Sequence, residues 1–341
     1  MIDLENYNLK PHNSFGTDVR CKRFVEYSTI EELRKIIAEL YARSEARVLH
    51  IGGGNNLLFT KDYDGVVLHS ALRGVDVLSS SGEDILVRAG SGEDWDNFVG
   101  KCVASGRYGL ENLSLIPGEV GASAVQNIGA YGVEVCNFIE SVEAVDAQTG
   151  ETTVFRTEEC RYGYRSSIFK HELKGRYYIT AVVFRLSKVF NPDLKYKAIE
   201  NAMEERGLTP EAMTPQALRQ LIIDVRRSKL PDPKEVGNAG SFFINPVVKR
   251  ETFERLYAVY PQMPHYLLPT GEVKIPAGWL IEQSGWKGKS LGKAGVWPLQ
   301  ALVLVNLGGA TGQDIVMLSD AVRQSVKDKF GIEIYPEVNF I

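Results

Sequence analysis

The sequence is organised around one stretch, Leu113-Ser114-Leu115-Ile116-Pro117-Gly118-Glu119-Val120-Gly121-Ala122, which continues to Gln126-Asn127-Ile128-Gly129-Ala130-Tyr131-Gly132. It combines glycines with other small residues, and its one charged residue is Glu119. We expect it to be too poor in large side chains to form core. Glycine serves where a backbone takes positive φ or approaches another body closely, and successive N–H groups in such turns form an anion site. The stretch indicates either a tight turn with a closely packed helix or, as we favour, a backbone pressed against a large anionic ligand.

Composition sets limits on the class of protein. A length of 341 residues favours about two domains, and the net charge of −4 argues against general nucleic-acid binding. We find no secretion signal at the N-terminus and no apolar run of the roughly 18 residues that a membrane span needs. The four cysteines and five histidines lack metal-ligand spacing. We therefore expect a cytoplasmic protein with free thiols, no bound metal, and no nucleic-acid or membrane partner.

A β-α-β pattern opens the chain. It consists of a helix from Thr29 to Arg43, a strand over 47–51 that leads into Gly52-Gly53-Gly54-Asn55-Asn56, and a strand over 65–69. The dinucleotide fingerprint fails, because Leu57 stands where its third glycine belongs and no helix signal follows. Gly288-Lys289-Ser290 resembles the end of a P-loop, but Gln283 stands in place of its first glycine. An anion-binding turn at 52–56 remains the interpretation.

Further elements follow in α+β fashion. The patterns predict strands over 84–89, 141–146, 177–186 and 301–306, and helices over 94–105 and 312–330. Residues 187–207 form an excursion with a short charged helix, which could act as a lid. A helix capped at Thr214-Pro215 follows, and we expect the second domain to begin before it.

Three residues are candidates for chemistry, each beside a simpler interpretation. Arg165 lies in a Tyr-Gly-Tyr-Arg-Ser-Ser run and suits a grip on a carboxylate, or it is a surface arginine. Ser241 borders Phe242 and Phe243 and could donate a proton, or it could bond its own turn. Glu337 follows a proline in a strand-like run, so the direction of its side chain is fixed, or it is an edge-strand surface glutamate.

An ordered set of motifs resembles the FAD-dependent UDP-N-acetylenolpyruvoylglucosamine reductase (MurB) family in its longer, type I form. The set covers nearly the whole chain, and Ile244 departs from it where many type I members have lysine. The matching motifs are Asn13-Ser14-Phe15, Ile51-Gly52-Gly53-Gly54-Asn55-Asn56-Leu57, Ile116-Pro117-Gly118, Val120-Gly121-Ala122, Gln126-Asn127-Ile128-Gly129-Ala130-Tyr131-Gly132, Tyr162-Gly163-Tyr164-Arg165-Ser166-Ser167, Ala239-Gly240-Ser241-Phe242-Phe243, Asn245-Pro246, Pro276-Ala277-Gly278-Trp279-Leu280-Ile281-Glu282 and Pro336-Glu337-Val338.

The resemblance implies an α+β fold: an FAD-binding domain of the vanillyl-alcohol-oxidase/PCMH type in two α+β parts, followed by a smaller α+β substrate-binding domain. The two FAD-binding parts would span 1–70, to which the tail 331–341 returns, and 71–207, with a tyrosine-bearing loop over 187–207. The substrate domain would span 208–330. The implied activity is reduction of UDP-N-acetylglucosamine enolpyruvate with bound FAD and NADPH as co-substrate, in bacterial peptidoglycan synthesis, by a monomer.

The resemblance also implies roles for single residues. Arg165 polarises the substrate carboxylate, Ser241 protonates C2, and Glu337 acts beside Arg165 as an acid. The residues that it implies for cofactor binding are Gly52, Gly53, Gly54, Asn55, Asn56, Pro117, Gly118, Gly121, Ala122, Gly129, Tyr131 and Gly132. Substrate binding falls to Tyr164, Tyr196, Lys229, Asn245 and Gln300.

Two other functions stay open from the sequence. One is a flavoenzyme on the same fold that oxidises a hydroxy acid or an alcohol, but it leaves the joint occurrence of Arg165, Ser241 and Glu337 unexplained. The other is a nucleotide-sugar binding protein or an NTPase without redox chemistry. A yellow preparation would exclude this second alternative.

Overall fold

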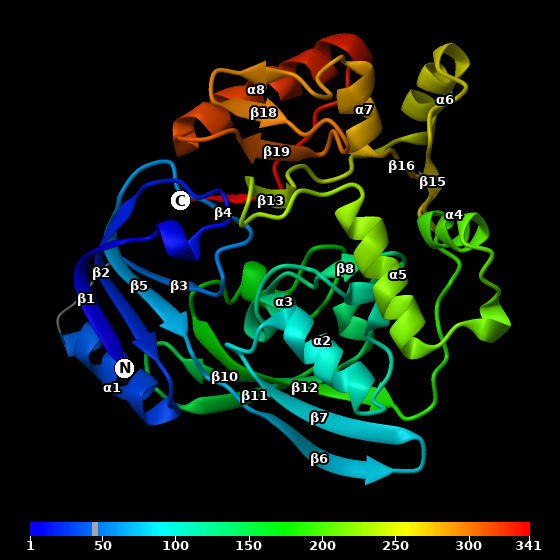
Figure 1. The fold of residues 1–341 in the computed structure, drawn as a ribbon. Coiled ribbons are helices and arrows are strands. Elements are labelled where there is room, and N and C mark those ends of the chain that lie inside the picture. Colours follow the sequence, from blue (N-terminus) through cyan, green and yellow to red (C-terminus); the bar gives the residue numbers. More distant parts are fainter. Residues whose placement is uncertain (43–46) are drawn as a thin grey trace. The chain divides into compact units, whose positions relative to one another are not determined.

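The computed structural model describes residues 1–42 and 47–341, and the chain divides into two compact units. The first unit comprises Met1–Tyr7, Cys21–Gly53 and Asp64–Arg226. The second comprises Asn8–Arg20, Gly54–Tyr63 and Arg227–Ile341. Each unit therefore combines segments that are far apart in the sequence, as the colours of Figure 1 make visible.

The first sheet of the first unit has the order β1 (Ile2–Asn8), β2 (Arg20–Tyr27), β5 (Tyr63–Ser70), β3 (Val48–Ile51). Strands β3 and β5 are parallel, and Ile51 pairs with His69. Helix α1 (Ile30–Ala42) buries Leu33, Ile36, Ile37 and Leu40 in a core shared with β2 and β5. Thr29 Oγ1 accepts the Glu32 N–H at 3.1 Å, which confirms the predicted start of this helix; its predicted last residue, Arg43, lies outside the described residues.

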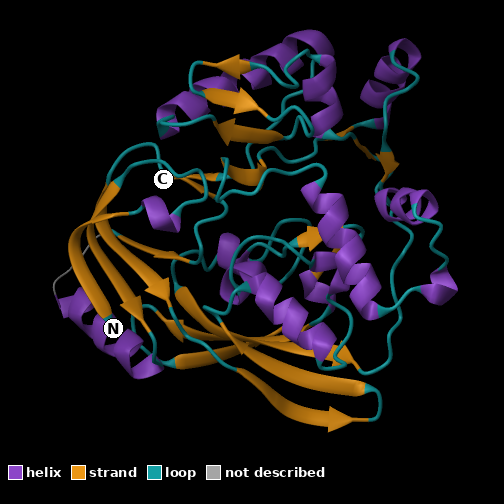
Figure 2. Ribbon diagram, in the orientation of Figure 1, coloured by secondary structure: helices purple, strands orange, loops and turns teal. Residues whose placement is uncertain are grey.

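The second sheet of the first unit is antiparallel throughout, in the order β11 (Thr152–Arg156), β10 (Ile139–Asp146), β12 (Tyr177–Ser187), β7 (Asp84–Gly90), β6 (Val75–Ser81). Helices α2 (Trp95–Ala104) and α3 (Val120–Val125) lie over one face of it (Figure 1; Figure 2). The predicted strands and helix of this region are confirmed. Strand β6 was not predicted: six of its seven residues are exposed and the seventh is half-buried, so it has no alternation of buried and exposed positions.

The stretch over 113–132 contributes to this core, so our expectation that it would not is wrong. Leu113, Val120 and Ala124 are fully buried against the sheet. Val120 and Ala124 lie on α3, a short helix of small residues whose sequence carries no helical periodicity. The stretch then forms a small hairpin of β8 (Gly129–Ala130) and β9 (Val133–Glu134).

The first unit is completed by α4 (Lys197–Glu205) and α5 (Pro215–Arg227). They share a small core that includes Ile199, Met203, Leu218 and Ile222. The chain thus passes to the second unit after Arg226, whereas the sequence places the domain boundary before residue 208. The two units are defined by how compactly the chain packs. The boundary between the FAD-binding and substrate-binding parts before residue 208 stays a prediction.

The second unit has two small sheets, a strand pair and three helices, held by a core of its own. The first sheet has the order β13 (Gly237–Ser241), β19 (Val303–Asn306), β18 (Ala294–Val296), β17 (Ser290–Leu291), and the second the order β14 (Val247–Val248), β16 (Val273–Lys274), β15 (Tyr266–Leu267). The helices are α6 (Arg250–Val259), α7 (Ala277–Gln283) and α8 (Gly312–Phe330). Strand β20 (Asn339–Phe340) pairs in parallel with β4 (Leu57–Leu58).

Helix α8 has the bounds that the sequence predicts. Thr311 and Asp314 form a reciprocal capping box at its start, and Gly331 ends it with a φ of 67°. Short 3-10 helices occur at Lys10–His12, Glu111–Leu113, Val135–Asn137, Ile168–Lys170 and Pro210–Ala212.

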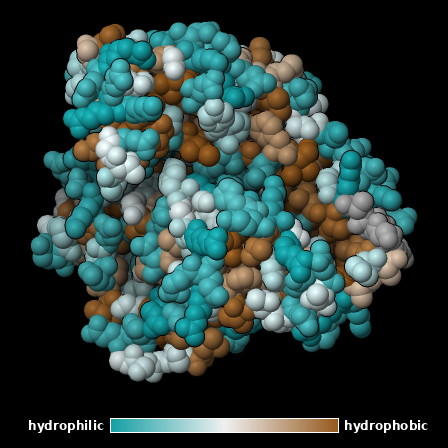
Figure 3. Space-filling view, turned by 180° about the vertical axis from the view of Figure 1, so that it is seen from behind, coloured by the Kyte–Doolittle hydropathy of each residue, from teal (hydrophilic) through white to brown (hydrophobic). Residues whose placement is uncertain are grey.

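Hydrophilic side chains cover much of the face drawn in Figure 3, with apolar ones scattered among them. Within residues 1–42 and 47–341, no helix combines the length and the apolar character needed to cross a lipid bilayer.

Candidate functional site

The first glycine-rich turn is shaped by close contacts in each unit. In the first unit, a Cβ atom on Gly52 would lie 3.1 Å from Ala122 Cβ and 3.2 Å from Glu119 Oε2, so this turn touches the second glycine-rich stretch. In the second unit, Gly54 has a φ of 68°, and a Cβ there would lie 1.9 Å from the His12 carbonyl oxygen. Gly54 therefore has no room for a side chain, and Gly52 is tightly packed.

Asn56, the last residue of this turn, is bonded to the C-terminal segment. Asn56 Nδ2 donates to the Glu337 carbonyl at 3.3 Å, and the Asn339 N–H donates to the Asn56 carbonyl at 3.0 Å. Gly53 and Asn55 are half-buried. The turn is therefore fixed by backbone pairing on its C-terminal side.

The second glycine-rich stretch is tied to the strand-to-helix turn after β7. Gly118 has a φ of 134°, and its carbonyl accepts the Trp95 N–H at 3.0 Å. The Gly121 N–H donates to the Ser91 carbonyl at 2.8 Å, and a Cβ on Gly121 would lie 2.7 Å from Ser91 Cβ. Pro117 and Ala122 are exposed, so this stretch presents small residues on its outer side.

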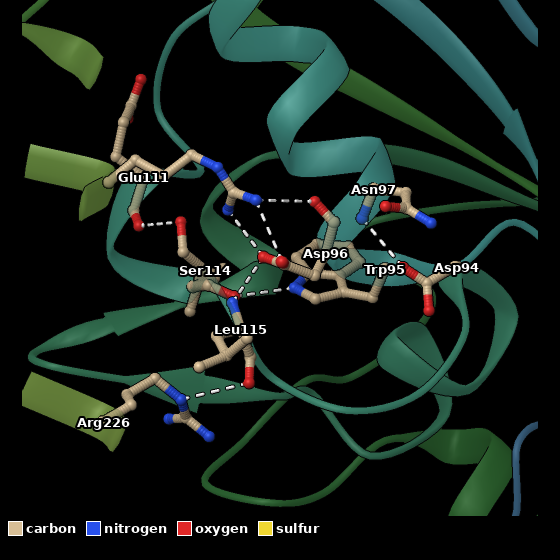
Figure 4. A network of polar contacts seen from close by, with 10 residues as sticks. Asp94, Trp95, Asp96, Asn97, Glu111, Ser114, Leu115 and Arg226 are labelled. Carbon is tan, nitrogen blue, oxygen red and sulfur yellow. Dashed lines mark hydrogen bonds and ion pairs between the residues drawn. The ribbon is translucent and has the colours of Figure 1, made fainter. Parts of the chain in front are cut away.

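A polar network fixes the backbone just before Pro117 (Figure 4). Leu115 has a φ of 58°, its N–H donates to Asp96 Oδ1 at 2.6 Å, and its carbonyl accepts from Arg226 Nε at 3.2 Å. Arg219 Nη1 also donates to Asp96 Oδ1, at 2.6 Å. The sequence analysis missed all three side chains. A signal exists in α5: Arg219 and Arg226 are seven residues apart, beside the apolar face formed by Leu218, Leu221, Ile222 and Val225.

Arg165 is held by backbone carbonyls. It has a φ of 52°, Nη2 donates to the Gly129 carbonyl at 2.6 Å, and Nη1 donates to the Asn127 carbonyl at 3.3 Å. Asn127 is fully buried, and its Nδ2 donates to Glu134 Oε2 and to the Gly163 carbonyl, each at 2.9 Å. The exposed ring of Tyr164 lies 5.3 Å from the Arg165 guanidinium carbon. Arg165 is thus a fixed cation, because two bonds orient the plane of its guanidinium.

Tyr131 and Gly132, predicted to bind the cofactor, lie beside the predicted substrate residue Tyr196. The Tyr131 and Tyr196 rings meet edge to face with centroids 5.5 Å apart. Gly132 has a φ of 85°, and a Cβ there would lie 3.9 Å from the Tyr196 ring. Tyr196 is 40% exposed, so one edge of its ring remains accessible.

In the second unit, Ser241 and Glu337 belong to neighbouring segments. Ser241 is the exposed last residue of β13. The Glu337 N–H donates to the carbonyl of the next residue, Phe242, at 2.8 Å, and the Ile244 N–H donates to the Tyr335 carbonyl at 2.9 Å. Glu337 is 9% exposed. A buried carboxyl and an accessible hydroxyl are therefore carried by two paired segments.

Asn245 and Gln300 both contact the start of α7. Asn245 Oδ1 accepts the Ala277 N–H at 2.9 Å. A Cβ on Gly278 would lie 3.0 Å from Gln300 Oε1. Lys229 is exposed in the segment that follows α5. The predicted catalytic residues thus divide between the units, with Arg165 in the first and Ser241 and Glu337 in the second.

The glycine-rich stretches fit a dinucleotide cofactor. Gly54 and Gly121 leave no room for a side chain and Gly52 leaves little, so these positions present backbone. Glu119 Oε2 is buried beside Gly52 and has no hydrogen-bond partner among the described residues. It is an acceptor, and FAD carries ribityl and ribose hydroxyls that donate as well as a pyrophosphate that accepts. Within the described residues, no group of three or more metal-ligating side chains occurs.

Two family models match the chain. The model of the FAD binding domain matches residues 21–156, which include Gly52 and the stretch over 113–132. The model of the UDP-N-acetylenolpyruvoylglucosamine reductase C-terminal domain matches residues 232–341, which include Ser241 and Glu337. Together they bear out the expected order of an FAD-binding domain followed by a second domain.

Relatives match over nearly full length. A UDP-N-acetylenolpyruvoylglucosamine reductase of Bacteroides fragilis is 54% identical, covering 99% of each chain. One of Porphyromonas gingivalis is 48% identical, covering 99% of this chain and 98% of its own. The solved structure of the corresponding reductase from Thermus caldophilus is 22% identical, with a TM-score of 0.68 over 99% of this chain and 98% of its own. The predicted α+β fold class, with its FAD-binding domain, is confirmed.

Proposed function

Because the chain belongs to the UDP-N-acetylenolpyruvoylglucosamine reductase family, we propose that it reduces UDP-N-acetylglucosamine enolpyruvate to UDP-N-acetylmuramate with FAD and NADPH, in peptidoglycan precursor synthesis. The observation that carries this proposal is the match at 54% identity over 99% of both chains. In the balanced reaction, C3 of the enolpyruvyl group receives a hydride that originates from NADPH, and C2 receives a proton. The carbon–carbon double bond becomes a single bond, and NADP⁺ is released.

FAD, when bound, supplies a group that accepts hydride from NADPH and passes it to the substrate. The backbone around Gly52 to Asn56 and Pro117 to Ala122 would hold its pyrophosphate, and Gly129, Tyr131 and Gly132 would also contribute to binding FAD. Gly54 and Gly121 have no room for a side chain and Gly52 has little, which supports this assignment. The groups that would bind the pyrophosphate are backbone N–H groups. Such groups bind an anion without a net positive field around them, which agrees with the net charge of −4.

Arg165 binds the substrate carboxylate and stabilises the negative charge that accumulates on C2 and the carboxylate. A preorganised cation stabilises such charge without having to reorganise during the reaction. The bonds from Arg165 to the carbonyls of Asn127 and Gly129 support this role, because they fix the guanidinium in advance. Glu337 acts beside it as a hydrogen-bonded acid.

Ser241 gives its hydroxyl proton to C2. Its exposure at the end of β13 supports this role, since a proton donor must be reachable by the substrate. Lys229, Asn245 and Gln300 hold the diphosphate and the sugar, and Tyr196 closes over the nucleotide. Tyr164 also binds the substrate. Residues 1–70 with the tail 331–341, and residues 71–207, serve FAD; residues 208–330 serve the substrate. The enzyme acts as a monomer in the bacterial cytoplasm, where NADPH and nucleotide sugars are available.

An anaerobic experiment tests this function. The purified yellow protein is reduced with NADPH, and the enolpyruvyl nucleotide sugar is then added. We expect the flavin absorbance to disappear in the first step and to return in the second. A protein that stays reduced with this substrate, but is itself reduced by a hydroxy acid or an alcohol, would be an oxidase of that class instead. A colourless protein that does not bind FAD would exclude flavin chemistry.

A further inference from the structure

His69 makes an ion-pair bridge between two carboxylates within the first unit. It lies on β5, where it pairs with Ile51, the residue immediately before Gly52. Its Nδ1 lies 2.8 Å from Glu26 Oε2 on β2, and its Nε2 lies 3.0 Å from Glu119 Oε1 in the second glycine-rich stretch. The ring is 6% exposed, and Phe24 stacks on it with centroids 6.3 Å apart. The neighbouring strands β2, β5 and β3 appear together in Figure 1.

The geometry requires two protons on this cluster. An ionised carboxylate only accepts hydrogen bonds, and a neutral imidazole carries a single N–H. Both bonds can therefore form in two ways. Either an imidazolium lies between two carboxylates, or a neutral imidazole lies between one carboxylate and one protonated carboxyl group. Burial by itself would lower the pKa of His69, but the bonds and charges of Glu119 and Glu26 outweigh it and raise that pKa above its ordinary value.

Glu119 joins the two glycine-rich turns. One of its carboxylate oxygens bonds His69, and the other is the buried, unpartnered Oε2, 3.2 Å from the position of a Cβ on Gly52. The side chain of Glu119 thus packs against the first turn while its backbone belongs to the second. This carboxylate, with Ala122 Cβ, therefore forms the contact between the two turns at Gly52.

The other titratable groups around the bridge do not take over its role. His50 on β3 is half-buried and bonds Tyr27 at 2.7 Å, and desolvation lowers its pKa to about 3, so it stays neutral. Burial raises the pKa of Tyr27, and the charges of Tyr178 and Glu119 raise it further. Tyr7 lies near Glu26, Cys21 lies near Tyr7, and burial raises the pKa of each. None of these groups supplies a positive charge near neutral pH, and His69 is left to do so.

We propose that His69 is a positioning residue of the cofactor cradle: its protonated ring holds Glu119 between the two glycine-rich turns and offsets the carboxylate charge next to the bound pyrophosphate. When the proton leaves, two carboxylates face a neutral ring, one of the two bonds is lost, and the charge beside the anionic cofactor becomes more negative. FAD therefore binds less tightly as pH rises through the pKa of His69. This inference rests on the proposed function in that FAD is the ligand.

The test is the dissociation constant for FAD as a function of pH, measured from the change in flavin fluorescence when apoprotein is added between pH 6 and pH 9. For the wild type we expect Kd to rise at least about tenfold across this range, since one unit of linked pKa shift corresponds to a factor of ten. His69→Gln should bind FAD weakly at pH 6 with little change in Kd up to pH 9. His265→Gln, a histidine of the second unit that bonds the Met263 carbonyl, should retain the wild-type pH dependence.

Glu119→Gln separates positioning from folding. A glutamine amide can donate to the neutral Nε2 of His69 while Nδ1–H donates to Glu26, so both bonds survive deprotonation. We expect this variant to bind FAD with a Kd that is nearly independent of pH, and it carries the test if His69→Gln fails to fold. The inference is overturned if the wild-type Kd does not change with pH, or if Glu119→Gln keeps the wild-type dependence. A wild type that binds no FAD at any pH would instead overturn the proposed function.

A second readout needs no cofactor. Because the pKa of His69 is raised in the folded state, its bridge stabilises the apoprotein fully below the ordinary histidine pKa of about 6.5, and this stabilisation is lost as pH rises through the raised value. The free energy of unfolding of the apoprotein should therefore fall over that range in the wild type, and should fall less in Glu119→Gln. An equal decline in both proteins would contradict the assignment to this bridge.

Discussion

Arg165 illustrates how a single residue acquires its properties from distant backbone. Its guanidinium donates to the carbonyls of Asn127 and Gly129, which are 38 and 36 residues earlier in the chain. Gly129 is favoured there, because a Cβ would lie 2.9 Å from the Val133 carbonyl oxygen and 3.0 Å from Arg165 Nη1. The Tyr-Gly-Tyr-Arg-Ser-Ser run singled out Arg165, but nothing in the sequence identified these carbonyls. The resemblance implies that Gly129 binds the cofactor. In the structure, the Gly129 carbonyl accepts a hydrogen bond from Arg165 Nη2.

At the residue scale, Ser241→Ala tests the proton donor. We expect the step in which substrate reoxidises the flavin to slow by about 10²–10³, the usual cost of losing one preorganised polar group. Reduction of the flavin by NADPH should change little, because that step uses no proton from Ser241. Stopped-flow absorbance measures both steps in the same preparation. An equal loss in the two steps would remove Ser241 from the assigned role.

At the scale of elements, long periodic helices were predictable and short ones were not. The periodic apolar faces of α1, α5 and α8 gave their positions from the sequence. Helix α3 has six residues of Val, Gly, Ala and Ser, so no amphipathic period could reveal it. Its place is set by tertiary bonds, such as the one from the Gly121 N–H to the Ser91 carbonyl.

Helices α2 and α5 hold the strained backbone before Pro117, and their ion pair can be tested. Arg219→Ala removes the bonds to Asp96, which also accepts the Leu115 N–H. The side chains of this pair are 19% and 25% exposed. We expect a loss of about 1.5–3 kcal/mol in the free energy of unfolding, the range for hydrogen bonds to charged groups. Urea denaturation measures it.

The matched control for this pair is Arg206→Ala, which breaks the more exposed pair with Asp224 on the same helix. Surface pairs contribute about 0–1 kcal/mol, so this variant should remain close to the wild type. If the two variants lose the same stability, the network around Leu115 does not have the structural role assigned to it.

At the scale of the whole molecule, both units are discontinuous in sequence. The second unit includes Asn8–Arg20 and Gly54–Tyr63 beside the C-terminal segment. Within it, Asn306 Nδ2 donates to the Phe15 carbonyl at 2.9 Å, and the Thr60 N–H donates to the Ile341 carbonyl at 2.9 Å. Patterns along the chain predict elements in order, but pairings over nearly 300 positions depend on tertiary packing. For this reason the motifs were identified from the sequence, whereas the division into units was not.

The mass of the product is the most direct test of the central claim. The enzyme is incubated with NADPH and the enolpyruvyl nucleotide sugar without oxygen, and the nucleotide sugar is then analysed by mass spectrometry. We predict a product heavier than the substrate by two hydrogen atoms, formed in a one-to-one ratio with the NADPH oxidised. An unchanged nucleotide sugar, in a preparation that contains FAD and is reduced by NADPH, would contradict the proposed function.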